Sequence, residues 1–374
     1  MHKNFAISVF VVLILAFNNA NVRGQDDLLF KRHIVFSTLN GLYYGIAIDI
    51  ITEAKGGAVA GIPIITAGVA GVIPVIANSS RTISQSSLVL SDHGSRIGWL
   101  HGFALATLIG GDNAWNDNNY KLSVGLGALT SIGLGIVGNS IGKKYELSEG
   151  AAGLYRHYGW IGPFTGISLM AATTDNSRFY GAADLLFGAG GYLLASEINK
   201  SHEFTAGDIR ATQVLALLNG ELGFGISTVR AESINVKRSD ILWPAIGLLS
   251  GSLVSHVWLK DAGFTQHQGM LTAYAASGGA LIGLGIAMIT ESDKPAPYFF
   301  IPYATGLAAY AYAVETLKKK NIMQGSATTG KKGKWDLAFM PQNIILNKSI
   351  YRDISSGSGS FYLMQPLFSA SYKF

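Results

Sequence analysis

Four stretches of the chain repeat the same order of features, and this repeat limits the possible folds more than any other property of the sequence. Each stretch opens on a residue that can cap a helix and continues into an apolar segment rich in glycine. The stretches begin at Thr82, Glu146, Phe204 and Phe264, about 60 residues apart, a period typical of stacked supersecondary units. A more apolar segment precedes each one, so the repeating unit is predicted to be a helical hairpin.

The capping residues mark where these helices should begin. Three stretches open with the spacing of a capping box or a close variant, in which a hydroxyl accepts a hydrogen bond from a backbone N–H and the third residue reaches back to the cap. The pairs are Thr82 with Gln85, Thr205 with Asp208, and Thr265 with Gln268. Ser148 opens the remaining stretch without such a partner, because Ala151 stands at the third position.

We therefore predict a mainly α protein of about ten Gly-rich apolar helices, arranged as repeated hairpins and followed by a short C-terminal β segment. Breaks between helices are expected at 112–118, 173–176, 231–240 and 291–297. An all-β outer-membrane barrel is the alternative, because "KLSVGLGALTSIGLGIV" alternates large and small residues. Helices are favoured because barrel strands alternate apolar with polar residues, whereas later segments are apolar or small on both sides.

Glycine costs about 1 kcal/mol relative to alanine inside a helix, so the 46 glycines need a compensating role. Close approach of neighbouring helix backbones is the usual one. The glycines predicted to pack helices in this way are Gly94, Gly98, Gly102, Gly162, Gly166, Gly279 and Gly283. None of the glycine strings follows a strand with the GxGxxG spacing of a dinucleotide site, so no cofactor is predicted.

The first 24 residues have the pattern of a secretory signal peptide. Lys3 supplies the positive charge, an apolar run follows, and small residues precede a cleavage site near Gly24. The apolar run has about 13 residues, fewer than the roughly 20 that a membrane anchor needs. We predict a signal peptide at 1–24, a helical-hairpin body at 25–317, a basic flexible linker at 318–334 and a β segment at 335–374.

The composition lies at the membrane-like edge of the globular range, with 49% apolar and 14% charged residues. Three uncharged segments, 122–142, 270–290 and 295–314, are each about 20 residues long, enough to cross a bilayer. In a cytoplasmic-membrane protein the basic loops should lie inside. In this chain, the loops that would lie outside the cytoplasm carry more basic residues than the loops that would lie inside. This distribution argues against an inner-membrane transporter.

Charged residues interrupt the capped helices at Arg96, Arg156, Arg210 and Glu221. In lipid, such residues face a bundle interior or a water-filled cavity, so they are candidates for a polar path through the bundle. The favoured alternative is that these helices keep one aqueous face and are not fully immersed.

The chain ends in "FYLMQPLFSASYKF", where Phe368, Ala370, Tyr372 and Phe374 fall on one side. This tail resembles the closing strand of Gram-negative outer-membrane β-barrel proteins. The resemblance implies an outer-membrane location and recognition by the barrel-assembly machinery. Because single-chain barrels start at about eight strands, the tail is expected to pair with another copy of the chain or with a partner barrel.

No catalytic or metal-binding group of residues is predicted. "SDHGS" has the residue types of a hydrolytic triad, but neighbours on one helix point apart, whereas triad members converge from separate elements. The lysines near 318–334 lie among Gly, Ser and Thr, which argues against a nucleic-acid partner. We expect a non-enzymatic outer-membrane or envelope scaffold that contacts membrane lipid and packs with partners or its own copies. The alternative is a membrane transporter or channel whose polar path is lined by the capped helices.

Overall fold

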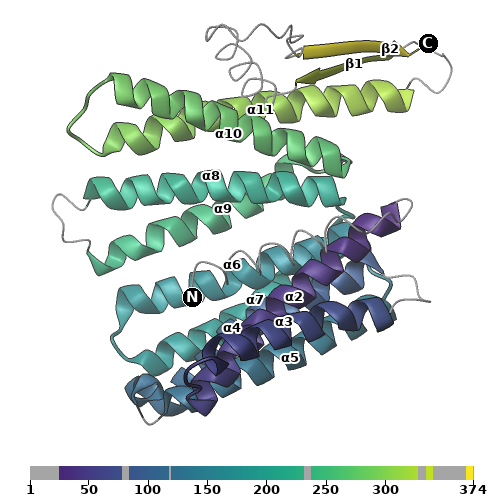
Figure 1. Cartoon of the computed structure of the whole chain (residues 1–374). Helices are drawn as coiled ribbons and strands as arrows, with labels where there is room; N and C mark the ends of the chain where they lie inside the picture. Colours follow the sequence, from purple (N-terminus) through teal and green to yellow (C-terminus); the bar gives the residue numbers. More distant parts are fainter. Residues whose placement is uncertain are drawn as a thin grey trace, which may run out of the picture. The chain divides into compact units, whose positions relative to one another are not determined.

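The computed structural model describes residues 25–77, 84–117, 119–230, 237–326, 334–339 and 368–373. Ten α-helices follow one another in these ranges (Figure 1). They are α2 (Gln25–Thr52), α3 (Ala58–Ala77), α4 (Gln85–Gly110), α5 (Tyr120–Lys144), α6 (Glu149–Thr173), α7 (Ser177–Ser201), α8 (Ala206–Arg230), α9 (Leu242–Trp258), α10 (Gln266–Ile289) and α11 (Ala296–Ser326). The mainly α prediction is confirmed, and the all-β alternative is wrong for the described residues.

The ends of the helices agree with most of the predicted breaks. Two short 3₁₀ helices, Gly111–Trp115 and Arg238–Ile241, occupy two of them. The chain divides into two compact units, Met1–Asn321 and Ile322–Phe374. Helix α11 continues through Ser326, so the first part of the predicted 318–334 linker is helical. Lysine is a good helix former, which explains how the basic run extends the helix.

Two short strands, β1 (Lys334–Phe339) and β2 (Phe368–Lys373), pair in antiparallel register near the C-terminus. Trp335 pairs with Tyr372, Leu337 with Ala370, and Phe339 with Phe368. These strands form the predicted short β segment. Phe374, the last residue of the barrel-like tail, lies outside the described residues, as does the predicted signal peptide at 1–24.

Helices that follow one another in the sequence pack as hairpins: α2 with α3, α4 with α5, α6 with α7, and α8 with α9. The hairpins then stack in chain order, because α4 contacts α6, α6 contacts α8, and α8 contacts α10. The second helix of a hairpin also packs on the first helix of the preceding one, as α7 does on α4 and α9 on α6. The predicted hairpin repeat is therefore a two-layered stack in which α4, α6, α8 and α10 form one layer.

Adjacent hairpins are joined at the capped ends of α8 and α10. The Asp208 carboxylate accepts hydrogen bonds from the N–H of Thr205 at 3.0 Å and from the N–H of Phe264 at 2.9 Å. The Thr205 hydroxyl donates to the carbonyl oxygen of Phe264 at 2.5 Å. The Asp208 carboxylate therefore satisfies backbone donors of two successive repeats.

The predicted capping boxes have different outcomes. The pairs of Thr205 with Asp208 and Thr265 with Gln268 are both confirmed. At α4 the cap is Ser84, whose hydroxyl accepts from the N–H of Ser87, and Gln85 is the first helical residue. The predicted partner Thr82 lies outside the described residues. A serine two residues later takes the capping role because its side chain reaches the first free N–H groups equally well.

The predicted packing glycines lie against the next helix of their hairpins. A Cβ added at Gly98 would lie 2.5 Å from Cα of Ser131 in α5, and one at Gly102 would lie 2.5 Å from Cα of Gly127. Gly94 in α4 faces the backbone of Leu134 in α5. Gly162 and Gly166 face α7, and Gly279 and Gly283 face α11. Side chains at these positions would collide with backbone, so the helices approach closely only because the side chains are missing.

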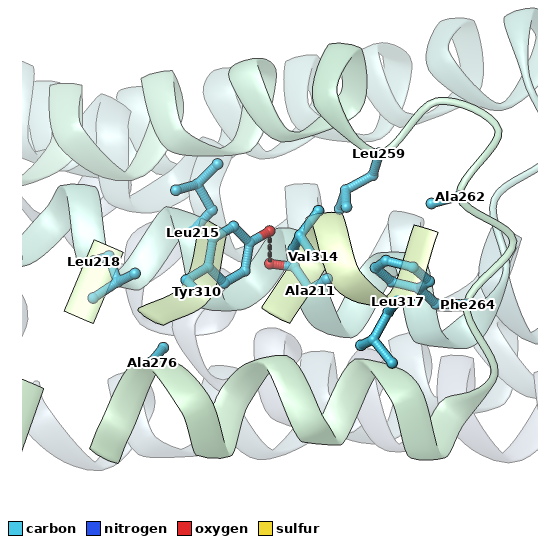
Figure 2. Close-up of a cluster of buried hydrophobic side chains, with 10 residues drawn as sticks. All are labelled: Ala211, Leu215, Leu218, Leu259, Ala262, Phe264, Ala276, Tyr310, Val314 and Leu317. Atoms are coloured by element: carbon cyan, nitrogen blue, oxygen red, sulfur yellow. Dashed lines mark hydrogen bonds between the residues drawn. The ribbon is translucent and has the colours of Figure 1, made fainter. Parts of the chain in front are cut away.

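The largest buried apolar cluster joins α8, α10 and α11 to the loop before α10 (Figure 2). The Tyr310 ring lies among Leu215, Leu218 and Val314, and its hydroxyl donates to the carbonyl oxygen of Ala211 at 3.1 Å. Phe264 fills the end of the cluster that is nearest the α10 cap. The last hairpin is therefore held to α8 mainly by apolar burial, with one buried hydroxyl satisfied.

Large apolar side chains also cover much of the outer surface of the helices. Leu193 is 69% exposed, Ile282 64% and Val257 81%, while Ser131, Thr212 and Asp184 are buried. Four described helices are long and apolar enough to cross a membrane: Phe30–Thr52, Tyr120–Lys144, Arg238–Trp258 and Gln266–Ile289. The distribution of apolar surface and the lengths of these helices are compatible with a membrane protein.

Candidate functional site

A cavity of about 620 Å³ lies between α4, α6 and α8, and it is lined mainly by residues that the three capped helices supply. Helix α4 contributes Asp92, His93 and Arg96, and helix α6 contributes Arg156 and His157. Helix α8 adds Arg210 and Gln213. Three of the four residues predicted to form a polar path therefore meet in one cavity.

Glu221, the fourth residue predicted to form this path, does not line the cavity. It lies on α8, about three turns beyond Arg210, and is partly buried. The helical rise separates the two side chains along α8, so the carboxylate does not take part in the arginine cluster.

The positions of the arginines follow from the stacking of the repeat. Helices α4, α6 and α8 occupy equivalent places in successive hairpins, which brings residues about 55 to 60 positions apart onto neighbouring surfaces. At 1.5 Å per residue, Arg210, Arg156 and Arg96 lie about 8, 12 and 18 Å along their helices from the capping residues. The three guanidinium groups are therefore staggered in depth along the cavity.

Among the described residues that line the cavity, Asp92 alone carries a carboxylate. Nε of Arg96 donates to Oδ1 of Asp92 at 2.9 Å, and the Asp92 side chain is 7% exposed while that of Arg96 is 45% exposed. Nη1 of Arg210 lies 3.5 Å from Oε1 of Gln213, a neutral acceptor. In the ranges that the structure describes, Arg156 and Arg210 form no ion pair with a carboxylate. Positive charge therefore exceeds negative charge in the cavity.

Helix α2 brings a further arginine close to the cluster. The guanidinium of Arg32 lies 5.2 Å from the ring centre of Phe36, and that of Arg96 lies 4.9 Å from the same ring. Arg156 experiences the electrostatic field of both Arg32 and Arg210. The aromatic ring partly compensates the two cations beside it through cation–π contacts, but it carries no formal negative charge, and the excess remains.

Two buried histidines in the lining of the cavity form hydrogen bonds to neighbouring helices. Nε2 of His93 is hydrogen-bonded to the Tyr192 hydroxyl of α7 at 2.8 Å, and Nε2 of His157 to the Ser252 hydroxyl of α9 at 2.9 Å. Each bond joins a helix of the layer formed by α4, α6, α8 and α10 to a helix of the other layer. The bonds therefore hold the two layers in register. Sequence reasoning missed these partners, because residues about 95 to 100 positions apart give no local signal.

Two other histidine bonds lie close by. Nδ1 of His101 in α4 is bonded to Oδ2 of Asp184 in α7 at 2.5 Å, and both side chains are buried. Nε2 of His256 in α9 is bonded to the Tyr158 hydroxyl of α6 at 2.7 Å. Such polar contacts between helices stabilise bundles whose surroundings are apolar.

Apart from the charged and polar residues that α4, α6 and α8 supply, the lining of the cavity is apolar. It comes from α6 and α8, where it follows the arginines along each helix, and from one residue of α9. It is formed by Trp160, Ile161, Phe164, Ala216, Leu217 and Leu248. On α6 and α8 the lining thus has a basic part toward the capped ends and an apolar part further along, whereas Arg96 of α4 lies about as far from its cap as Trp160 and Leu217 do from theirs. A second hollow of about 360 Å³, bounded by Tyr158, Thr165 and Phe187 among others, has no charged residue in its lining.

The residues present limit the chemistry of the site. Within the described residues, no group of three or more His, Cys, Asp or Glu side chains is placed to hold a metal ion. The planar guanidinium groups carry donors whose geometry matches the oxygens of carboxylate and phosphate groups. The arrangement is therefore suited to holding an anion.

The chain matches no protein-family model, and no curated protein or solved structure shows significant similarity to it.

Proposed function

We propose that the protein is a membrane-embedded helical protein that binds a multivalent anion in the cavity between α4, α6 and α8 and acts as a carrier or channel for it. The observation that carries this proposal is the meeting of Arg96, Arg156 and Arg210 in one cavity, where Asp92 is the only carboxylate among the described lining residues. This favours the transporter or channel interpretation over the envelope scaffold.

The apolar outer surface supports the membrane part of the proposal. A soluble protein rarely leaves large contiguous apolar patches in water, whereas lipid solvates them without cost. The helices satisfy their backbone groups internally, as a bilayer requires. Polar residues such as Asp184, Ser252 and Thr272 are buried between the helices, where charged and polar side chains of membrane bundles are usually found.

The charge balance supports the anion. Among the described residues, three arginines and one carboxylate line the cavity. Arg156 is half-buried, whereas Arg96 and Arg210 are exposed, and withdrawing a cation from water without a carboxylate partner is costly. A bound anion offsets this cost, and arginine forks hold carboxylate or phosphate oxygens through paired hydrogen bonds. A purely structural scaffold gives no reason to gather cations from three repeats around a cavity.

The location proposed for this function is the outer membrane. Its support is the tail resemblance at Phe368, Ala370, Tyr372 and Phe374 together with the signal-like first 24 residues. The barrel-assembly machinery and a partner barrel or second copy are proposed as partners on the same grounds. No catalytic role is proposed.

The test measures anion binding by the purified protein in detergent. Inorganic pyrophosphate is titrated while thermal unfolding is followed by circular dichroism, and the double variant Arg156→Gln with Arg210→Gln is compared with Arg178→Gln, an exposed arginine outside the cavity. A hydrogen bond to a charged group contributes about 1.5–3 kcal/mol, so the double variant should bind at least about tenfold more weakly while Arg178→Gln stays unchanged. Equal binding by all three proteins would refute the proposal.

A further inference from the structure

On α6 and α8 the lining of the cavity is divided along the helices into a charged part and an apolar part, and this division points to the chemical class of the ligand. On α6, Arg156 precedes Trp160 and Phe164 by one and two helical turns, and all three line the cavity. On α8, Arg210 precedes Leu217 by about two turns on the same cavity wall. Both helices therefore present a cation near the capped end and apolar side chains deeper.

The apolar part is accessible within the described structure. Leu217 is 67% exposed, and Trp160 and Phe164 are each about 40% exposed although they border a cavity of about 620 Å³. A small hydrophilic anion would contact only the arginine part and would leave these side chains without contact to the ligand. A ligand with both an anionic group and a hydrocarbon chain covers the whole wall.

We propose that the cavity binds an anionic lipid whose headgroup is a phosphate monoester, with the phosphate held by Arg156 and Arg210 and an acyl chain lying along Trp160, Phe164 and Leu217. This inference rests on the proposed function, because it names the class of anion that the same cavity takes. Charge complementarity selects an anionic headgroup: Arg156 and Arg210 form no ion pair in the described ranges, and the carboxylate of Asp92 is already bonded to Arg96.

Two cations without a carboxylate partner favour a phosphate over a single carboxylate. A phosphate monoester carries up to two negative charges and three acceptor oxygens, so it can accept from both guanidinium groups at once. The headgroup then sits near the capped ends of α6 and α8, and the chain extends toward the middle of the helices. This orientation matches the polarity of a lipid leaflet, whose charged groups lie at the membrane surface.

The experiment uses the full-length protein in detergent micelles and follows tryptophan fluorescence. Phosphatidic acid with brominated acyl chains quenches a tryptophan in contact with the chain. Brominated phosphatidylcholine, whose phosphodiester is balanced by a quaternary ammonium, serves as the probe without net charge. The signal of Trp160 is obtained by comparing the protein with its Trp160→Phe variant, and Trp115→Phe is the matched control because Trp115 lies in the 3₁₀ helix after α4, outside the cavity lining.

Brominated phosphatidic acid is expected to quench the Trp160 component at a concentration at least about tenfold lower than brominated phosphatidylcholine needs. Arg156→Gln with Arg210→Gln should remove this preference. Leu217→Asn should weaken phosphatidic acid binding while leaving pyrophosphate binding unchanged, and helical circular dichroism shows whether each variant folds.

The outcomes separate the two proposals. Pyrophosphate binding that depends on Arg156 and Arg210, together with no quenching of Trp160 by phosphatidic acid, overturns the lipid assignment and leaves the anion site standing. Equal quenching by the two lipids also overturns it, because the net negative charge of the phosphate monoester then plays no part. Absence of both pyrophosphate and phosphatidic acid binding overturns the anion site and the lipid assignment together.

Discussion

Replacing Gly98 by alanine tests whether missing side chains hold the α4–α5 hairpin together. A Cβ at this position would lie 2.5 Å from Cα of Ser131, 2.7 Å from its backbone N and 2.7 Å from the carbonyl oxygen of Thr130. Carbon atoms in contact normally lie about 3.5–4.0 Å apart. All three neighbours are backbone atoms of α5, so no side-chain rotation can relieve the overlap, and the helices must separate by about 1 Å.

The expected change in the free energy of unfolding combines two opposing effects. Overpacking costs about 1–3 kcal/mol, and three rigid contacts place Gly98 in the upper part of this range. Alanine gains about 1 kcal/mol relative to glycine through its higher helix propensity. Gly98→Ala should therefore lower stability by about 1–2 kcal/mol.

Gly133 supplies the matched control. It lies in α5, in the same hairpin, and a Cβ added there meets nothing within 4 Å. Gly133→Ala should therefore raise stability by up to about 1 kcal/mol, and the two variants should differ in sign. Unfolding of each purified protein in detergent is followed by circular dichroism during heating or denaturant titration. If Gly98→Ala is as stable as Gly133→Ala, close backbone approach does not explain the glycines.

Three further changes test other parts of the structure. Asp184→Leu leaves the buried His101 ring without its hydrogen-bond partner and should cost about 1–3 kcal/mol. Adding His101→Leu should recover part of this loss in the same unfolding assay, and a double variant less stable than Asp184→Leu would contradict the pairing. Asp208→Ala removes the acceptor of two backbone N–H groups and should cost about 2–4 kcal/mol, while Asp208→Asn, which keeps one oxygen, should cost less; equal losses would speak against the shared cap. Deleting Phe374 should remove the protein from the dense membrane fraction in a density gradient, and unchanged sedimentation would contradict the outer-membrane signal.

The number and limits of the helices could be predicted because the determining signals are local. Turn residues gather at 112–118 and 173–176, and capping residues precede α6, α8 and α10. A cap acts on N–H groups only two or three residues away, so its effect is contained in a short stretch of sequence. The same locality explains the one displaced cap: Ser84 and Thr82 offer equivalent hydroxyls, and only the folded chain shows that Ser84 is used.

The members of the candidate site could be predicted only as separate residues. Arg96, Arg156 and Arg210 stand out because each is a charge within an apolar repeat. Glu221 stands out for the same reason, yet it does not line the cavity. Sequence position gives the face of a helix, but the partner of that face depends on how the hairpins stack.

The sequence by itself determined a series of capped, Gly-rich helices in hairpins, since helix propensity, caps and turns act over a few residues. The tertiary structure alone decided which of these residues meet. It joined His101 to Asp184 and His157 to Ser252 across 83 and 95 positions, and it gathered three arginines in one cavity. These contacts arise from the packing of whole helix faces, in which backbone approach at glycines fixes the depth and rotation of each helix.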